Sequence, residues 1–141
     1  MNNIIGKKSR KELIGVHSDL VIVVTGTYEI CGDKGLDLTV FDGLRALAEQ
    51  KEYVRTGVSW TMKSRHLPQE DGFGHAVDLY PFIEGKVRPE AIKALIVMGK
   101  AAKKVAAHHG IPIKWGALKK YGGDWTRHND MYHIETDRRY Y

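Results

Sequence analysis

The sequence predicts an α+β fold, and three observations support this prediction. Segments with the helical period of 3.6 residues are grouped apart from short segments with strand-like alternation, instead of alternating with them regularly. The chain has 141 residues, a length that suits one compact domain spanning residues 1–141. Hydrophobic residues make up 43% and charged residues 28%, which is typical of a globular protein with a core.

The first half of the chain contains signals for three helices and one strand. Ser9 and Glu12 have the spacing of a capping box, so a helix is expected to begin at Ser9. A second helix is expected to follow Ser18. Residues 36–41 alternate between apolar and polar side chains, which predicts a strand with one buried face. Residues 46–55 are rich in helix-forming types and predict the third helix.

The second half is dominated by one long amphipathic helix. This helix is expected to begin at Pro89, a favoured first position, and to end near Gly110. Its apolar stripe is formed by Ile92, Leu95, Ile96, Gly99, Ala102 and Ala106. Short strands are expected at residues 76–80, 111–115 and 131–136, so that strands both precede and follow the helix.

Charge and composition exclude several classes of protein. There are 22 Lys and Arg against 17 Asp and Glu, and the net charge of +5 favours an anionic partner such as nucleic acid, a membrane surface or a bacterial envelope. No aromatic residue separates the lysines of the long helix, so we expect no specific nucleic-acid binding. The longest apolar run, residues 20–25, is too short to insert into a membrane. Cys31 is the only cysteine, which excludes a disulfide within the chain and a multi-cysteine zinc site.

Three of the seven histidines stand beside strand-like segments and near carboxylates: His66, His75 and His133. The other four suit turns or helix ends, where a structural role is expected: His17, His108, His109 and His128. Two imidazoles and one carboxylate, such as Asp78, form the three-ligand set of a catalytic zinc ion, whose fourth position holds water. The sequence therefore predicts a metal site that includes two of the three selected histidines.

A further carboxylate is needed beside such a site as a general base. Asp130 is the candidate, but it lies three residues before His133 and would point the other way along a regular strand. This assignment therefore requires a turn or bulge before His133. Glu135 is the alternative, because it shares a strand face with His133.

Several motifs occur in order along nearly the whole chain. They are Ser9 with Leu13, residues 15–20, residues 42–45 with Gln50, residues 57–66, residues 76–81, residues 123–125, and Asp130 with His133 and Glu135. Together they resemble the metallopeptidase family that includes phage L-alanyl-D-glutamate endolysins, vancomycin-resistance D-Ala-D-Ala dipeptidases and zinc D-Ala-D-Ala carboxypeptidases. The phage branch matches best.

The resemblance implies a fold, a cofactor and roles for particular residues. It implies a small antiparallel sheet with flanking helices, as in the zinc-binding hedgehog signalling domain. It implies a Zn²⁺ site with three ligands: His66, Asp78 and His133. Asp130 would be the general base, and Arg45 would hold a substrate carboxylate or stabilise the oxyanion. Ser64 would donate to the substrate backbone or shape its own loop.

The function implied is hydrolysis of the L-alanyl-D-glutamate bond in peptidoglycan stem peptides by metal-activated water. Cleavage of D-Ala-D-Ala bonds and a non-catalytic wall-binding phage module are the alternatives. No export signal is recognised at the N-terminus. We therefore expect a protein that is made in the host cytoplasm and acts at the bacterial cell wall during host lysis. We also expect it to be a monomer.

Two segments depart from the family pattern. The family places its ligand Asp seven residues after the ligand His, whereas Asp78 follows His66 by twelve because of residues 67–73. His75 is therefore an alternative ligand to His66, although residues 64–66 match the family motif more fully. A second apparent insertion covers residues 117–121.

Overall fold

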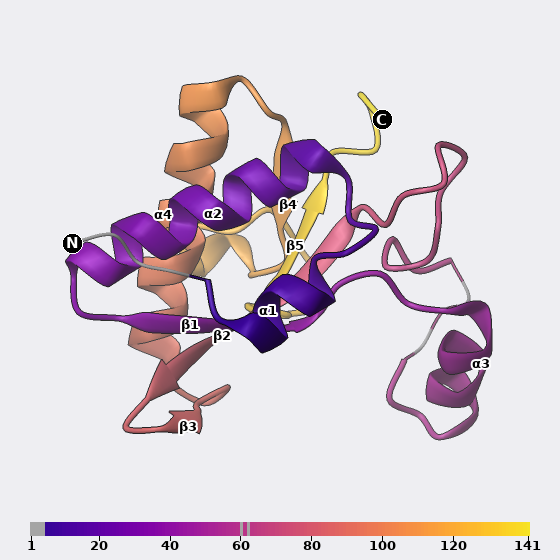
Figure 1. Cartoon of the computed structure of the whole chain (residues 1–141), viewed down its shortest axis with the longest axis horizontal. Coiled ribbons are helices and arrows are strands. Elements are labelled where there is room, and N and C mark those ends of the chain that lie inside the picture. The colour runs from indigo at the N-terminus through magenta and orange to yellow at the C-terminus, as the bar shows by residue number, and fades with distance from the viewer. Residues whose placement is uncertain (1–4, 60, 62) are drawn as a thin grey trace.

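The computed structural model describes residues 5–59, 61 and 63–141. Figure 1 shows the chain, whose elements in order are α1 (Lys7–Glu12), α2 (Ser18–Asp33), β1 (Asp37–Asp42), α3 (Leu47–Arg55), β2 (Ala76–Ile83), β3 (Lys86–Val87), α4 (Ile92–His109), β4 (Ile113–Trp115), the 3₁₀ turn η1 (Lys119–Tyr121) and β5 (His133–Thr136). Trp60 and Met62, which belong to one of the family motifs, lie outside the described residues. None of the described helices is long and apolar enough to cross a membrane.

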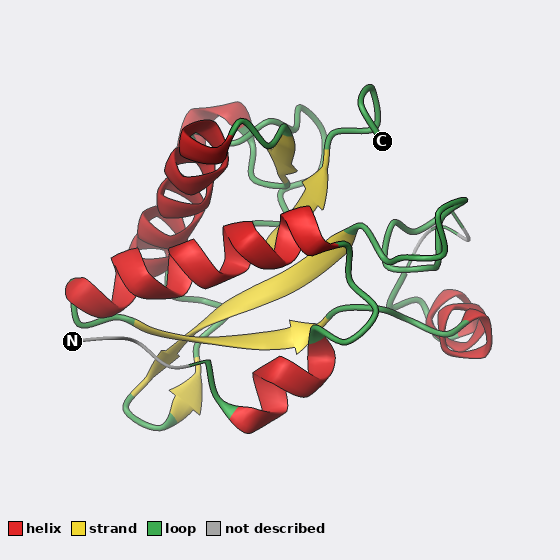
Figure 2. Cartoon of the chain, turned by 45° about the horizontal axis from the view of Figure 1, so that its top comes forward, coloured by secondary structure: helices red, strands yellow, loops and turns green. Residues whose placement is uncertain are grey.

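The described strands form one antiparallel sheet, in the order β1, β2, β5, β4, with β3 paired to β2. Figure 2 shows the helices beside this sheet, with α2 lying across the strands. The α+β prediction with a small antiparallel sheet is confirmed. The strand β2 is central, because it pairs with β1 on one side and with β5 on the other.

The core lies where α2 and α4 pack on the sheet and on each other. It contains Leu20, Val23, Val24, Leu95, Met98, Val40, Val77, Leu79, Trp115 and Ile134, all of them buried. The Trp115 ring lies against Gly99 of α4 so closely that a Cβ on Gly99 would be 2.1 Å from the ring. The glycine in the predicted apolar stripe is therefore required for the helix to approach β4.

The opposite face of the sheet carries polar residues, because side chains alternate along each strand. Val77 and Leu79 of β2 are in the core, whereas Asp78 between them points to the other face, where it is paired in register with His133 of β5. A β-bulge between Val40 and Asp42 places Asp42 opposite Asp78. Bulges commonly redirect side chains beside functional sites, and this one brings Asp42 to the Asp78 face.

Several predicted elements are confirmed by the structure. The predicted helix over residues 46–55 is α3, with Ala46 at its N-cap. The strand over residues 36–41 is β1, shifted by one residue, and its Leu38 and Val40 are buried as the alternation predicted. The long helix α4 ends at Gly110, which caps it with φ of +66°.

The prediction that a helix begins at a Ser9 cap is wrong. The helix α1 begins at Lys7, and Gly6 is its N-cap. The Ser9 hydroxyl instead accepts a hydrogen bond from the Val40 backbone N–H at 2.9 Å and another from the Tyr28 hydroxyl at 3.0 Å. Ser9 therefore ties α1 to β1 and α2, because a buried strand N–H offers it a long-range partner.

The predicted start of the long helix at Pro89 is also wrong. Pro89 lies in a turn that the Ala91 N–H closes on the Arg88 carbonyl at 3.3 Å, and α4 begins at Ile92. Proline suits the second position of such a turn as well as the start of a helix. The strands differ in length as well: β2 runs three residues further than predicted, and β4 and β5 each begin two residues later.

Candidate metal centre and active site

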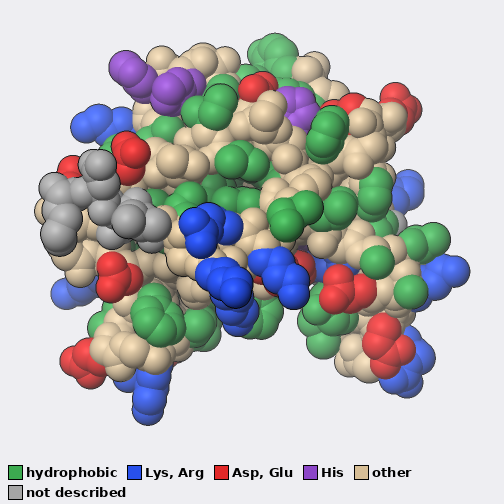
Figure 3. Space-filling model, viewed as in Figure 1, with side chains coloured by type: hydrophobic (Ala, Val, Ile, Leu, Met, Phe, Trp, Pro, Cys, Tyr) green, Lys and Arg blue, Asp and Glu red, His purple; other side chains and the backbone are tan. Residues whose placement is uncertain are grey.

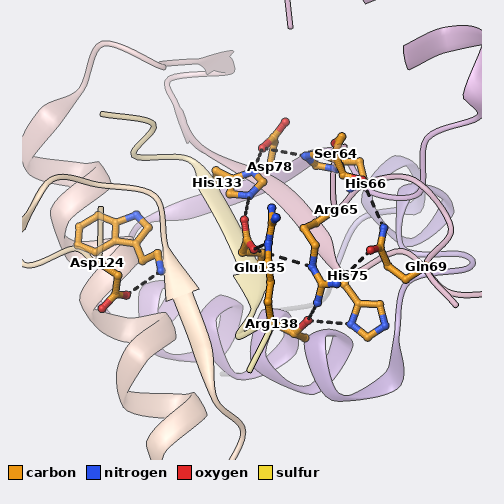
Figure 4. Close-up of polar contacts among 12 residues, drawn as sticks. Ser64, Arg65, His66, Gln69, His75, Asp78, Asp124, His133, Glu135 and Arg138 are labelled. Carbon is orange, nitrogen blue, oxygen red and sulfur yellow. Dashed lines mark hydrogen bonds and ion pairs between the residues drawn. The ribbon is translucent and has the colours of Figure 1, made fainter. Parts of the chain in front are cut away.

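Three predicted ligands converge on the polar face of the sheet. His66 comes from the loop before β2, Asp78 from β2 and His133 from β5, and one ligand atom of each lies within 4.8 Å of the others. Asp78 Oδ1 lies 3.4 Å from His66 Nε2 and 3.3 Å from His133 Nδ1. Figure 4 shows the two imidazoles directed at this carboxylate from either side.

The outer nitrogen of each imidazole is held by a hydrogen-bond acceptor. His66 Nδ1 donates to the Gly43 carbonyl oxygen at 2.8 Å, and His133 Nε2 donates to Glu135 Oε1 at 2.9 Å. Because a carbonyl or a carboxylate oxygen only accepts, each of these nitrogens carries the ring proton. When each ring is neutral, the nitrogen that faces Asp78 is therefore the one with the lone pair, as a metal ligand requires.

Two of the three separations within this group match those around a tetrahedral metal ion, and the third is within 4.8 Å. Nitrogen and oxygen ligands about 2.0–2.2 Å from a tetrahedral ion are about 3.3–3.6 Å apart from each other. The two distances from Asp78 Oδ1, 3.3 and 3.4 Å, fall in this range. The three residues could therefore hold a divalent metal ion between them.

The charges around the group favour a cation. Burial by itself would raise the pKa of Asp78, but hydrogen bonds with His133 and His66 lower it below its ordinary value. Burial would likewise lower the pKa of His133, whereas its hydrogen bonds to Asp78 and Glu135 raise it to about 10. A proton and a metal ion would therefore compete for the space between Asp78 and His133.

Asp130 lies beside this group on the turn that the sequence argument required. The Asp130 N–H donates to the Gly116 carbonyl at 2.8 Å, and the His133 N–H donates back to the Asp130 carbonyl at 3.2 Å. Its Oδ1 is buried and has no hydrogen-bond partner among the described residues. Burial, together with the negative charge of Asp78, raises the pKa of Asp130 to about 6, although His133 and His66 oppose this shift.

Glu135, the alternative base, has a different position. It holds the far side of the His133 ring through Nε2, and it also accepts a hydrogen bond from Arg138 Nε at 3.1 Å. Arg65 Nε lies 3.8 Å from the same carboxylate. Glu135 is thus engaged behind His133, whereas Asp130 has an unengaged oxygen near the ligands.

Arg45 is buried, with 7% of its surface exposed. Its guanidinium is paired with Asp42 and donates to Gln50 Oε1 of α3 at 2.6 Å. One of its nitrogens lies 3.9 Å from Asp78 Oδ2, and its charge lies over the Tyr53 ring at 4.7 Å from the centroid. The bulge that turns Asp42 toward the site therefore also positions Arg45 beside Asp78, one of the predicted ligands.

Ser64 shapes the loop that carries His66. Its hydroxyl accepts a hydrogen bond from the His66 N–H at 3.1 Å. The inserted residues 67–73 close on themselves, because the Gln69 N–H donates to the Phe73 carbonyl at 2.9 Å. The longer interval before Asp78 therefore leaves His66 beside this carboxylate. Contact of Ser64 with a substrate stays a prediction.

His75 lies in a second cluster, with His17 and Asp71, whose ligand-type atoms are also within 4.8 Å of one another. His75 is 1% exposed, and its two nitrogens bond to Thr136 Oγ1 and to Asp71 Oδ2, each at 2.7 Å. His17 Nδ1 caps α2 by accepting from the Asp19 N–H. Sequence analysis set His17 aside and missed this grouping, because its members come from two loops that only the tertiary structure brings together.

Comparison with known proteins identifies the family. The whole chain, residues 1–141, matches the model of the phage L-alanyl-D-glutamate peptidase family. The chain is 30% identical over 139 residues to the L-alanyl-D-glutamate peptidase of Escherichia phage T5, covering 96% of this chain and 90% of that protein. The crystal structure of Serratia marcescens L-Ala D-Glu endopeptidase ChiX is similar, with a TM-score of 0.79 and 33% identity over 99% of this chain and 94% of that one. The resemblance inferred from the motifs is confirmed, and the chain belongs to the phage L-alanyl-D-glutamate peptidase family.

Proposed function

We propose that this chain hydrolyses the L-alanyl-D-glutamate bond of peptidoglycan stem peptides. The observation that carries this proposal is the convergence of His66, Asp78 and His133, each with a free ligand atom, beside a carboxylate that has an unengaged oxygen. The family of the chain supports the bond cleaved, since the two relatives are named for it. Two imidazoles and one carboxylate are the ligand set of a hydrolytic metal ion with an open position.

We infer that the resident ion is Zn²⁺, held by His66 Nε2, Asp78 and His133 Nδ1. This preference follows from the donor set, because mixed nitrogen and carboxylate ligands at these separations suit tetrahedral zinc. When bound, zinc would polarise the scissile carbonyl and lower the pKa of a water molecule. The Gly43 carbonyl and Glu135 orient the two imidazoles for this purpose.

Asp130 acts as the general base in this proposal. Its Oδ1 is free to accept a proton from the attacking water and to return that proton to the leaving amine of D-glutamate. A pKa of about 6 keeps the carboxylate mostly ionised at neutral pH, yet basic enough to take the proton. Glu135 serves a different purpose, because its carboxylate is engaged with His133 and Arg138.

Arg45 binds a carboxylate of the substrate in this proposal. The D-glutamate residue carries a carboxylate next to the scissile bond, and the buried guanidinium lies beside Asp78. Asp42 and Gln50 fix the orientation of the guanidinium, which is a requirement for binding a planar carboxylate. We also propose that the chain is a single-domain monomer, made in the host cytoplasm and acting at the cell wall. Size-exclusion chromatography tests whether it is a monomer.

Digestion of purified peptidoglycan tests the proposed reaction. Mass spectrometry is expected to find new N-terminal D-glutamate and no new reducing sugar. Asp130→Asn is expected to release far less, whereas Asp33→Asn, at the exposed end of α2, serves as the matched control and should release as much as the wild type. Release of terminal D-alanine would establish D-Ala-D-Ala cleavage in place of the proposed reaction. Binding to sacculi without any cleavage at saturating Zn²⁺ would favour a wall-binding module.

A further inference from the structure

A connected set of aromatic rings begins next to the predicted ligands: Tyr80 follows Asp78 by two residues, on the same face of β2, and Tyr132 directly precedes His133. The Tyr132 and Tyr80 rings are 4.6 Å apart between centroids, and the Tyr80 and Phe41 rings are 5.2 Å apart with an edge-to-face geometry. We call Phe41, Tyr80 and Tyr132 the aromatic shelf. It begins beside His133 in the chain and ends at the bulged residue of β1, the strand that pairs with β2.

The shelf is open to solvent, although its residues are large. Phe41 is 50% exposed, and Tyr80 and Tyr132 are half-buried. Phe41 is the extra residue of the β-bulge, so its position in the ladder differs from that of a regular strand residue. A contiguous exposed apolar surface next to a reactive centre is typical of a ligand-binding surface.

The chemistry of the substrate limits what can lie there. In peptidoglycan, the amino group of L-alanine is joined to the lactyl group of N-acetylmuramic acid, so the sugar ring is one amino acid and this lactyl group away from the scissile bond. One residue spans at most about 3.6 Å, and the sugar must therefore lie close to the metal centre. A wall peptidase of this specificity needs a surface for the sugar on one side of Asp78.

The two sides of Asp78 along β2 have different characters. On one side, Asp42 stands opposite Asp78, and from Asp42 the chain runs away from Tyr80 to Arg45. The positive charge of Arg45 suits the anionic D-glutamate part of the stem. In the other direction along β2 lies Tyr80, paired in register with Thr39 of β1. That side offers aromatic rings, which suit the apolar C–H face of a neutral sugar.

Beyond Phe41 the surface becomes basic. Lys8 Nζ lies 5.8 Å from the Phe41 ring centroid, and Lys and Arg side chains gather over α1 in Figure 3. Four of the six residues of α1 are basic: Lys7, Lys8, Arg10 and Lys11. A glycan strand lying along the shelf would bring carboxylates of its neighbouring stem peptides toward these cations.

We propose that the aromatic shelf binds the N-acetylmuramic acid residue and the adjoining glycan strand of peptidoglycan, with the stem peptide directed from the shelf to the metal centre. This proposal rests on the proposed function, because it takes the L-alanyl-D-glutamate bond as the one that is cleaved. It adds a determinant of specificity: the enzyme distinguishes a stem attached to sugar from a free stem.

Two substrates that differ only in the sugar test this proposal. One is the disaccharide tripeptide, and the other is the same tripeptide with an N-lactyl group, which preserves the amide on L-alanine. The wild-type protein is expected to have the higher kcat/KM for the sugar-bearing substrate. Phe41→Ala should reduce the ratio of the two kcat/KM values by about fivefold, since one aromatic stacking contact is lost, and Phe41→Tyr should restore it.

Tyr140→Ala is the matched control, because Tyr140 is an exposed aromatic residue, 66% exposed, near the C-terminus and outside the shelf. Its ratio should equal that of the wild type. An unchanged ratio in Phe41→Ala would overturn the proposal, and so would an equal loss on both substrates. Because Phe41 is half exposed, this substitution leaves the core intact.

Binding of glycan strands freed of their peptides separates the shelf from the reaction. The wild-type protein should retain such strands, and Phe41→Ala should retain them more weakly than Tyr140→Ala does. If glycan binding depends on Phe41 but no L-alanyl-D-glutamate bond is cleaved, the proposed function fails and the shelf stands. If that bond is cleaved but glycan binding and the kcat/KM ratio do not depend on Phe41, the shelf fails and the proposed function stands.

Discussion

Among the residues that the structure describes, two clusters each contain two histidines and one aspartate, and they differ in their hydrogen bonds. In the first, the outer nitrogens of His66 and His133 donate to the Gly43 carbonyl and to Glu135, so that in the neutral rings the inner nitrogens, which face Asp78, carry the lone pairs. In the second, His75 Nδ1 accepts from the Thr136 hydroxyl and its Nε2–H donates to Asp71, so that the nitrogen facing the aspartate is the protonated one. The residue types are the same, but only the first cluster is arranged as a set of ligands.

The second cluster is complete without a metal ion. Arg65 donates to Thr136 Oγ1 at 2.7 Å, so the Thr136 hydroxyl can donate its own proton to His75 Nδ1. The ring proton of His75 is then on Nε2, which donates to Asp71. His17 Nδ1 accepts from the Asp19 N–H, so the proton of its neutral ring is on Nε2. The comparison teaches that the group bonded to the far nitrogen decides whether a histidine is available to a metal ion.

The largest expected effect breaks the first cluster. His66→Ala should reduce bound zinc to background and hydrolysis by about 1000-fold or more, because the ion contributes several kcal/mol to the transition state. The matched His75→Ala should retain its zinc, since His75 belongs to the second cluster. Metal analysis of the purified variants measures both. Zinc lost from His75→Ala and kept by His66→Ala would reverse the assignment.

Asp130→Asn should keep zinc and reduce kcat by about 100- to 10,000-fold, the usual contribution of a general base. The wild-type kcat/KM should fall as the pH is lowered through a value at or below about 6, because the Asp130 carboxylate is then protonated and a bound cation lowers its pKa further. This acidic limb should be missing from the residual activity of the variant. Normal turnover in Asp130→Asn, with loss in Glu135→Gln, would make Glu135 the base.

Glu135→Gln should lower zinc affinity by about tenfold, because a neutral amide holds the His133 Nε2 proton less strongly than a carboxylate does. Competition with a chromogenic chelator measures the change. Glu29→Gln, an exposed position on α2, is the control and should leave affinity unchanged. An unaltered affinity in Glu135→Gln would remove Glu135 from the support of the metal centre.

The smallest effect is expected in the second cluster. Asp71→Ala should lower the free energy of unfolding by about 1 kcal/mol at neutral pH, through loss of its bond to His75, without loss of zinc. Burial by itself would raise the pKa of Asp71, but hydrogen bonds from the Phe73 N–H and from His75 lower it. The contribution of Asp71 to the free energy of unfolding is therefore lost as acid protonates its carboxylate. Urea unfolding at neutral and acidic pH, with the neighbouring Glu70→Ala as control, measures this. A drop in bound zinc would show that the cluster supports a metal ion.

The sequence contains enough local information to predict much of the fold. The stripe on α4 and the glycine at its end identify that helix, because both signals act within a few turns. The alternation in β1 marks Leu38 and Val40 as core residues. Ser9 and Pro89 were misassigned because each residue suits two local structures. Ser9 could cap a helix but bonds to the distant Val40 N–H, and Pro89 could begin a helix but lies in a turn.

The candidate site divides in the same way. The family motifs selected His66, Asp78 and His133 in spite of the lengthened loop, and the structure brings them together. The family resemblance placed Arg45 at the site but left its burial between Asp42 and Gln50 unknown. The grouping of His17, Asp71 and His75 was invisible, because it depends on two loops meeting in space.

By itself, then, the amino-acid order determined the positions of the main helices, the buried face of β1 and the chemical types available for a metal site. Only the tertiary structure decided which histidines have a free lone pair, which carboxylate keeps an unengaged oxygen, and where the β-bulge aims Phe41 and Asp42. The physical reason is that periodicity and caps act over a few neighbouring residues, whereas proton positions and strand register depend on hydrogen bonds between segments far apart in the chain.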